Sequence, residues 1–236
     1  MNLNHSVKKL IGNFNDIRKM RRINKNTVLS TTYKEWVDKL NRDSVKHPQK
    51  NNTYYYDVAM NLLHCQKGVC AYTEMFLCDS RFWDESNWEN GRYKSKKPEF
   101  LGELDHLDHR LKADKYWDWD NLFVVLEKVN RRKGTREVDE ILKPDTPGYD
   151  PMVYLEYNEK YDVFVPHAGI KDDLTKKRIQ HMLDALQINF DPVRRERRRF
   201  LKEVLKSQFM NEPIKIDRFF TAYQMVMSAR KRNNGI

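Results

Sequence analysis

Residues 103–134 read ELDHLDHRLKADKYWDWDNLFVVLEKVNRRKG, and this stretch decides the fold that we expect. Asp105 and His106 stand side by side at the end of a segment with strand character. Asn121 then opens the apolar run LFVVL, which is short and β-branched and therefore predicts a second strand, and Asn130 begins a basic helical turn. If the strands form a hairpin with the helix packed across it, Asp105 and Asn130 converge, while His106 points to the other side of the same small site.

These residue types suit phosphodiester hydrolysis. The carboxylate of Asp105 and the amide oxygen of Asn130 are hard ligands for Mg²⁺ or Mn²⁺, and Mg²⁺ keeps its other positions for water and substrate phosphate. The imidazole of His106 can take a proton from an attacking water near neutral pH. The cation would offset charge on the phosphate and on the leaving oxygen, so the metal and the base have separate tasks.

The composition is that of a globular chain with a buried core. The 236 residues are 39% hydrophobic, which supports one large domain or two small ones. The longest apolar run has five residues, so we expect no membrane span, and the N-terminus opens no apolar segment typical of a signal peptide. Three cysteines are too few for a disulfide framework, which favours a reducing cytoplasm.

The net charge of +10 is distributed unevenly. Residues 1–52 and residues 171–236 each carry +8, whereas residues 53–170 carry −6. Basic flanks around an acidic centre suit a protein that grips phosphates outside and holds a cation inside. The alternative is that the lysines and arginines only solvate helices.

The predicted fold class is α+β, mostly helical, with a small embedded ββα core that would hold the metal, and it has three regions. A basic helical region covers residues 1–66, the ββα core covers 67–140, and a loop, a hairpin and Arg-rich helices cover 141–236. The three regions are expected to form one compact unit.

Local signals place the individual elements. Thr32 begins a capping box for one helix, and a second helix runs from about Tyr54 to a stop at Gly68. Turns and short strands are expected over 70–102, and three prolines mark a loop over 143–151. Beyond it we expect a hairpin and three helices, with these signals: the alternating Val153, Leu155, Tyr157 and Tyr161, Val163, Val165, with a turn near Asn158; a cap at Thr175; an N-cap at Asp191, with that helix ending near Phe209; and a last helix over 217–231.

The spacing of Asp-His, Asn-Leu and Asn-Arg-x-Lys-Gly resembles the HNH endonucleases of the ββα-metal (His-Me finger) superfamily. The resemblance implies that Asp105 and Asn130 are metal ligands and that His106 is the general base. It gives Asn121 a structural part in the catalytic site, because its side chain tethers the loop that holds the base. The resemblance also implies that the basic residues after the motif contact phosphate, namely Arg131, Arg132 and Lys133; Arg110 is a further candidate for nucleic-acid binding.

More narrowly, the chain resembles the HNH nucleases of Septu-type and retron-associated bacterial antiphage systems. The similarity includes a Cys-Ala-Tyr segment that begins at Cys70, the Trp-x-Asn-Leu that begins at Trp119, and the Pro-rich loop. In those systems the nuclease works with an ABC-type ATPase, so the resemblance implies such a partner. The strong part covers only residues 103–136, and the match elsewhere is architectural.

One departure concerns zinc. Many of these nucleases hold a structural zinc with two Cys-x-x-Cys knuckles, but this chain has only Cys70 in the first, and Leu126 and Val129 occupy the second. One thiolate cannot replace four, so we expect no structural zinc. Packing is expected to replace it, through Tyr72, Trp117, Trp119 and Phe123.

Several readings stay open at this level. The substrate could be DNA or RNA, including tRNA, since the site reads a phosphate and no base. A regulatory subunit could retain the fold and bind nucleic acid without cutting it. The Arg-rich helix over 191–209 could bind DNA, dock on an acidic partner or be merely solvated. Asp108 and His109 could support the site or be ordinary polar residues, and the Trp pair at 117 and 119 favours core packing over base stacking.

Overall fold

The structure is a computed structural model, and it describes residues 23–30, 32–43, 54–94, 98–113 and 116–233. Much of the predicted N-terminal region, residues 1–22, 31 and 44–53, therefore lies outside the described residues.

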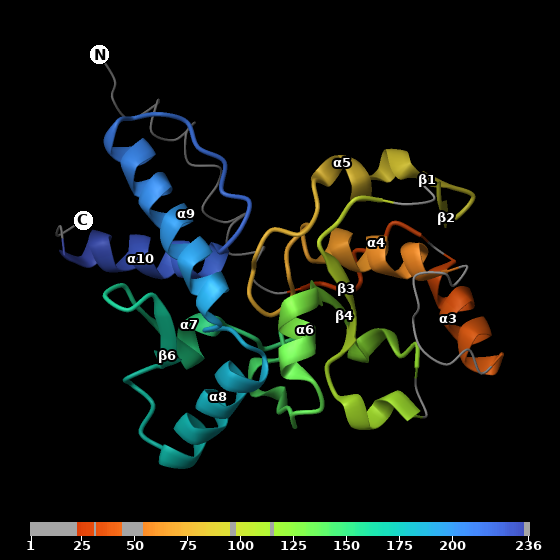
Figure 1. The fold of residues 1–236 in the computed structure, drawn as a ribbon, viewed down its shortest axis with the longest axis horizontal. Helices are drawn as coiled ribbons and strands as arrows, with labels where there is room; N and C mark the ends of the chain where they lie inside the picture. The colour runs from red at the N-terminus through yellow and green to blue at the C-terminus, as the bar shows by residue number, and fades with distance from the viewer. Residues whose placement is uncertain (1–22, 31, 44–53, 95–97, 114–115, 234–236) are drawn as a thin grey trace.

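The fold is α+β and mostly helical, as the sequence predicts. The described part of the chain holds eight α-helices and three two-stranded antiparallel sheets. Figure 1 shows two halves along the long axis, with the helices and strands of residues 33–126 in one, those of residues 151–233 in the other, and the helix Glu127–Lys133 between them. Buried residues of both halves form one continuous core. No helix in the described ranges has the length and apolar content needed to cross a bilayer.

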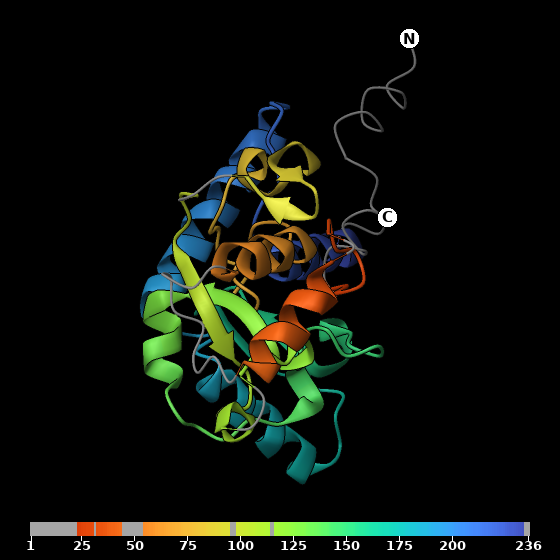
Figure 2. The ribbon, with the colours of Figure 1, turned by 90° about the vertical axis from the view of Figure 1, so that its right-hand side faces the viewer.

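The predicted strand–strand–helix unit is present at the centre. Strand β3 (Gly102–His106) pairs antiparallel with β4 (Leu122–Leu126), and α6 (Glu127–Lys133) follows directly. The register sets Asp105 opposite Phe123 and His106 opposite Leu122. Figure 2 shows the two strands side by side with α6 beside them.

Helix α4 (Tyr55–Cys65) supports both edges of this hairpin. Leu104 and Val124 are opposite each other in the register. At one end of α4 the Tyr55 hydroxyl accepts the Leu104 N–H at 3.2 Å. Just past the other end, the amide of Gln66 accepts the Val124 N–H at 2.9 Å and donates to its carbonyl at 2.8 Å. Side chains at the two ends of α4 thus satisfy backbone groups that a third and a fourth strand would otherwise satisfy, and the Ala71 N–H adds a further bond to the Val124 carbonyl at 3.2 Å.

The rest of the first half follows the prediction, with one correction. Helix α3 (Tyr33–Arg42) begins after Thr32, but the capping box does not form. The Thr32 hydroxyl instead donates to the Gly91 carbonyl at 3.3 Å, which ties α3 to the turn between β1 (Trp88–Glu89) and β2 (Arg92–Tyr93). The remaining short helices are α5 (Ser80–Trp83), η1 (Glu85–Asn87), η2 (His109–Ala113), η3 (Trp119–Asn121) and η4 (Glu140–Leu142).

The predicted hairpin of the second half is present but shorter. Its strands are β5 (Leu155–Asn158) and β6 (Val163–Pro166). Val153 lies in the short helix α7 (Pro151–Tyr154), because the Asp150 carboxylate accepts the Met152 N–H and a proline fits the first turn. Tyr161 belongs to the turn between the strands and not to β6.

Three helices complete the second half, with starts that differ slightly from the prediction. Helix α8 (Asp173–Ala185) is capped by Asp172, whose carboxylate accepts the N–H of Thr175. Asp191 lies inside the first turn of α9 (Asp191–Phe209) and is not its N-cap. The last helix, α10 (Phe220–Asn233), starts three residues later than expected. At its start the Glu74 carboxylate accepts from the N–H (2.8 Å) and the hydroxyl (2.6 Å) of Thr221, so a side chain 147 positions earlier caps it.

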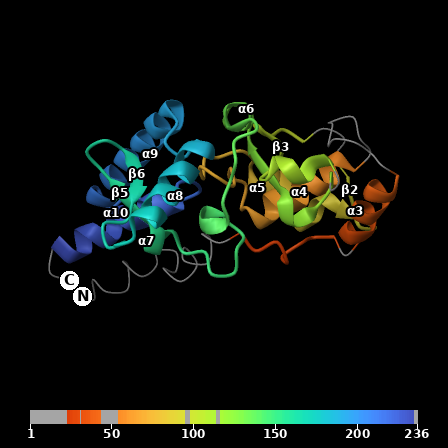
Figure 3. The same cartoon turned by 90° about the horizontal axis from the view of Figure 1, so that it is seen from below.

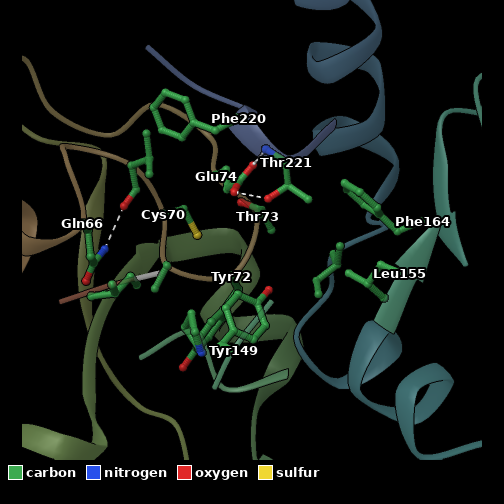
Figure 4. Close-up of a pocket in the computed structure, with 15 residues that line it drawn as sticks. Gln66, Cys70, Tyr72, Thr73, Glu74, Tyr149, Leu155, Phe164, Phe220 and Thr221 are labelled. Atoms are coloured by element: carbon green, nitrogen blue, oxygen red, sulfur yellow. Dashed lines mark hydrogen bonds between the residues drawn. The ribbon is translucent and has the colours of Figure 1, made fainter. Parts of the chain in front are cut away.

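Figure 4 shows this Glu74–Thr221 contact beside a cavity of about 40 Å³ between the two halves. The turn over residues 70–74 forms one wall, and Leu155, Phe164 and Phe220 face it from the second half. The second half therefore packs directly on the turn that carries Cys70 and Tyr72.

The Gln66 contacts yield a stability prediction. Gln66→Leu keeps the side-chain size but leaves the Val124 N–H without its partner, while the Val124 carbonyl keeps the Ala71 N–H at 3.2 Å. We expect the free energy of unfolding to fall by about 1–3 kcal/mol, the cost of one unsatisfied buried group. Urea unfolding followed by circular dichroism measures this. Gln180→Leu on the exposed face of α8 is the matched control, and an equal loss in both variants would contradict the role given to Gln66.

Candidate active site

Asp105 is buried and held by two side chains. It is 7% exposed, the Tyr72 hydroxyl donates to its Oδ2 at 2.6 Å, and the Lys133 ammonium lies 3.1 Å from the same oxygen. Burial raises the pKa of Asp105, although Lys133 and Tyr72 both act to lower it. The carboxylate is therefore fixed in position with part of its charge already neutralised.

Lys133, expected to contact phosphate, lies beneath the hairpin and is 1% exposed. Its ammonium also donates to the His106 carbonyl at 2.7 Å. One cation thus holds both the side chain of Asp105 and the backbone of the next residue. In this arrangement Lys133 organises the site from inside, and the phosphate contact remains a prediction.

Asn130 lies on the same side of the hairpin as Asp105 but has a different partner. Its Nδ2 donates to Glu103 Oε1 at 2.8 Å. The two-residue period of β3 puts Glu103 and Asp105 on one face, and α6 packs there. Because the amide nitrogen is engaged by Glu103, the amide oxygen is the end of Asn130 that is available to act as a ligand.

A backbone carbonyl fixes the tautomer of His106. Its Nε2 lies 2.6 Å from the carbonyl oxygen of Tyr116. A carbonyl can only accept, so Nε2 carries the proton and the neutral ring has its lone pair on Nδ1. This is the nitrogen with which His106 could take a proton from water.

Asn121 ties down the loop that follows His106. Its Oδ1 accepts the Asp108 N–H at 2.8 Å, and its Nδ2 donates to the Asp108 carbonyl at 2.9 Å. The Leu107 N–H also donates to the Asn121 carbonyl at 2.8 Å. These three bonds hold the chain directly after His106, in agreement with the tether that the motif predicts for Asn121.

Lys25 anchors the same loop from the opposite side. Its ammonium donates to the carbonyls of Trp119 (2.8 Å) and Asp120 (3.1 Å), lies 2.9 Å from Asp145 Oδ2, and sits 3.7 Å from the centre of the Phe123 ring. Burial is the main cause that lowers the pKa of Lys25 to about 8. Residues 116–121 are consequently held at three places, by His106, by Asp108 and by Lys25.

Asp108 and His109 lie in the loop that follows His106. The Asp108 carboxylate pairs with Arg110, at 2.8 Å from Nη2, and this hydrogen bonding lowers the pKa of Asp108. Asp108 therefore structures the loop, and its carboxylate is committed to Arg110. His109 begins the short helix η2 and is half-buried.

The other predicted phosphate contacts lie on the outside. Arg110 and Arg131 are 57% and 73% exposed at their side chains, and Arg131 pairs with Glu127 on its own helix. Arg132 donates to Gln187 Oε1 at 2.8 Å, which joins α6 to the second half. These three arginines lie at the surface and can contact a polyanion directly. Lys133, in contrast, is buried.

The oxygen donors fit a hard divalent cation. Asp105, Asn130 and Glu103 share one face and offer only carboxylate and amide oxygens, the ligands that Mg²⁺ and Mn²⁺ prefer. Within the described ranges no group of three or more His, Cys, Asp or Glu side chains is gathered for a metal. A cation here would depend on few protein ligands and on water, which is usual for Mg²⁺.

A hydrogen bond lies where the nucleases that the motif resembles place zinc ligands. The Cys70 sulfur accepts the Leu126 N–H at 3.4 Å, and burial raises the pKa of the Cys70 thiol. The rings of Tyr72 and Phe123 pack at 5.9 Å between centres, and Trp117 is fully buried. The core position expected for Trp117 is confirmed, and the absence of a structural zinc stays a prediction.

Sequence reasoning missed Glu103, Tyr72 and Lys25. Glu103 could have been found, since its spacing of two from Asp105 in a strand puts it on the same face. Tyr72 was noted only as packing, and its bond to Asp105 depends on the 70–74 turn. Nothing local to Lys25 distinguishes it from the other lysines of the N-terminal region.

No protein-family model matches the chain, and no curated protein matches its sequence.

The Asp105–Lys133 pair yields a double-mutant prediction. Asp105→Asn leaves a buried ammonium without its counter-charge, and Lys133→Met leaves a buried carboxylate without one, so each should cost about 3–5 kcal/mol of unfolding free energy. The double variant removes both charges and should recover most of the loss. Urea unfolding of the four proteins measures the coupling. Additive losses would show that the two charges do not depend on each other.

Proposed function

We propose that this protein is a metal-dependent HNH endonuclease that hydrolyses DNA phosphodiester bonds. The observation that carries the proposal is the pair of hydrogen bonds from Asn121 to the backbone of Asp108, because the motif assigned that tether to Asn121 and it lies directly after the candidate base. The strand–strand–helix arrangement of Asp105, His106 and Asn130 supports it further.

His106 acts as the general base in this proposal. Nδ1 takes a proton from a water molecule, and the water oxygen attacks phosphorus. The bond from Nε2–H to the Tyr116 carbonyl holds the ring and strengthens as the ring becomes positive. The phosphorus–oxygen bond to the leaving 3′-oxygen breaks, and this oxygen takes a proton from solvent, which yields the 5′-phosphate and 3′-hydroxyl ends usual for the family.

The face that carries Glu103, Asp105 and Asn130 would bind the metal ion. Asp105 and Asn130 would hold Mg²⁺ or Mn²⁺, and Glu103 would orient the amide of Asn130. When bound, the cation supplies positive charge at the scissile phosphate and the leaving oxygen. Lys133 keeps Asp105 in place, and Arg110, Arg131 and Arg132 supply the outer phosphate contacts.

The biological setting rests on the resemblance alone. We propose that the chain is the nuclease component of a bacterial antiphage system, that it works in the cytoplasm with an ABC-type ATPase, and that its substrate is DNA. Purified protein should be incubated with plasmid DNA and with RNA, with and without Mg²⁺, alone and with an ATPase encoded beside it. Cleavage of RNA alone would identify an RNA or tRNA nuclease, and salt-dependent binding without cleavage would indicate a regulatory subunit.

His106→Ala is the first test of the mechanism. Without the base, the cleavage rate should fall by at least about 100-fold, since general-base catalysis contributes roughly 10²–10⁴-fold. Melting temperature and DNA affinity in EDTA should stay near wild type. Plasmid nicking followed on gels measures the rate, with His181→Ala, an exposed histidine on α8, as control. Undiminished cutting by His106→Ala would refute the mechanism.

Metal titration tests the ligands separately. Asn130→Ala removes the proposed amide ligand, so half-maximal activity should require at least about tenfold more Mg²⁺, in line with the cost of disturbing a metal site. Binding of Mn²⁺ followed by electron paramagnetic resonance gives a second readout that does not need cleavage. Gln180→Ala, which removes an exposed amide of α8 away from the site, is the matched control. An unchanged metal profile for Asn130→Ala would contradict the ligand assignment.

A further inference from the structure

Helix α9 has an outer ridge of positive charge. Its inner face buries Val193, Phe200, Leu201 and Val204, together with the guanidinium of Arg197. Five exposed basic residues lie on the opposite face, at successive spacings of three, one, three and four positions: Arg195, Arg198, Arg199, Lys202 and Lys206. We call these five residues the α9 ridge. From residue 195 to residue 206 it is about 16 Å long at the rise of an α-helix.

The other two arginines of α9 are used within the fold. Arg197 is fully buried, donates to the carbonyls of Ile188 (3.2 Å) and Asp162 (3.0 Å), and lies 4.7 Å from the centre of the Phe164 ring. Arg194 donates to the Tyr161 carbonyl at 2.6 Å. Two arginines of α9 thus hold the fold together, and the exposed arginines of this helix are those of the ridge.

Acidic partners do not remove the ridge from contact with a ligand. Arg195 pairs with Asp191, Arg198 with Asp162, and Arg199 with Glu196. The side chains of Arg195 and Arg199 are nevertheless 77% and 73% exposed. Exposed ion pairs contribute little, and a guanidinium in such a pair keeps further donors for a phosphate.

The helix that carries the α9 ridge begins next to α6. Arg132 of α6 donates to Gln187, and its guanidinium lies 4.7 Å from the centre of the Phe190 ring, directly before α9 begins. Figures 1, 2 and 3 agree that α6 and α9 lie on the same side of the molecule. This placement suits a polyanion that contacts both helices.

The chemistry of the ridge favours nucleic acid over an acidic protein. Every exposed side chain of α9 between residues 195 and 206 is charged, whereas the centre of a protein–protein interface is depleted in charge and rich in aromatic residues. A row of cations suits the regular phosphates of a nucleic-acid backbone, which carry one charge per about 3.4 Å along each strand of a duplex.

We propose that the α9 ridge binds the phosphate backbone of duplex DNA beyond the cleavage site. The proposal rests on the endonuclease function proposed above and extends it, because it assigns a second, non-catalytic contact region to the same substrate. The ridge would supply affinity and orientation without reading sequence.

The test compares two triple variants with equal change in charge. Arg195→Gln/Arg199→Gln/Lys202→Gln removes three charges from the ridge. Lys34→Gln/Lys39→Gln/Arg42→Gln removes three exposed charges from α3, at the far end of the molecule in Figure 1. Anisotropy of a labelled 30-base-pair duplex in EDTA, at several salt concentrations, gives the affinity and its salt dependence without cleavage.

The ridge variant should bind about 10- to 100-fold more weakly at 0.1 M salt, and the slope of log K against log salt should decrease by about 2–3, because each lost phosphate contact removes about 0.9. The α3 variant should change affinity by less than about threefold, and circular dichroism should show both folded. Unchanged binding by the ridge variant, or an equal loss in both variants, would overturn the proposal. Cleavage is scored separately with Mg²⁺: a wild type that binds but never cuts would refute the endonuclease function and leave the ridge assignment intact.

Discussion

A two-stranded hairpin is marginal in water, and the candidate active site is built on one. The rest of the structure must therefore provide hydrogen-bond partners for the backbone groups on the outer edges of this hairpin. Helix α4 provides such partners from one residue near each end, the Tyr55 hydroxyl on β3 and the Gln66 amide on β4. Once these edges are fixed, α6 can pack across one face and bring Glu103, Asp105, Asn130 and Lys133 together.

The elements were predictable where the signal was local. The apolar run after Asn121, the alternation around Tyr157 and the helical periods of α4, α8 and α9 each predicted the right element. The errors lie at the ends, where a competing side chain decides. Asp172 and not Thr175 caps α8, and α10 begins where Glu74, from the other half, accepts its first donors. A contact across 147 residues leaves no trace in a local pattern.

Some residues of the candidate site could also be predicted from local sequence, and others could not. Motif spacing identified Asp105, His106, Asn121 and Asn130, and β3 periodicity could have added Glu103. The sequence could not show that Lys133, which we expected to contact phosphate, is buried against Asp105, because a surface lysine and a buried lysine look alike in sequence. The same holds for the arginines of α9, of which Arg197 is part of the core and Arg195 faces water. Burial decides the role of a charge, and burial is a property of the whole fold.

The hydrogen bond between Cys70 and Leu126 bears on whether the stability of the fold depends on metal ions in solution. A scaffold closed by four thiolates gains stability in proportion to the logarithm of the free zinc concentration, and a chelator unfolds it. The contact between the Cys70 thiol and the Leu126 N–H needs no metal ion to form. If folding is independent of zinc, as the sequence predicts, a chelator would stop the chemistry proposed here and leave the protein folded.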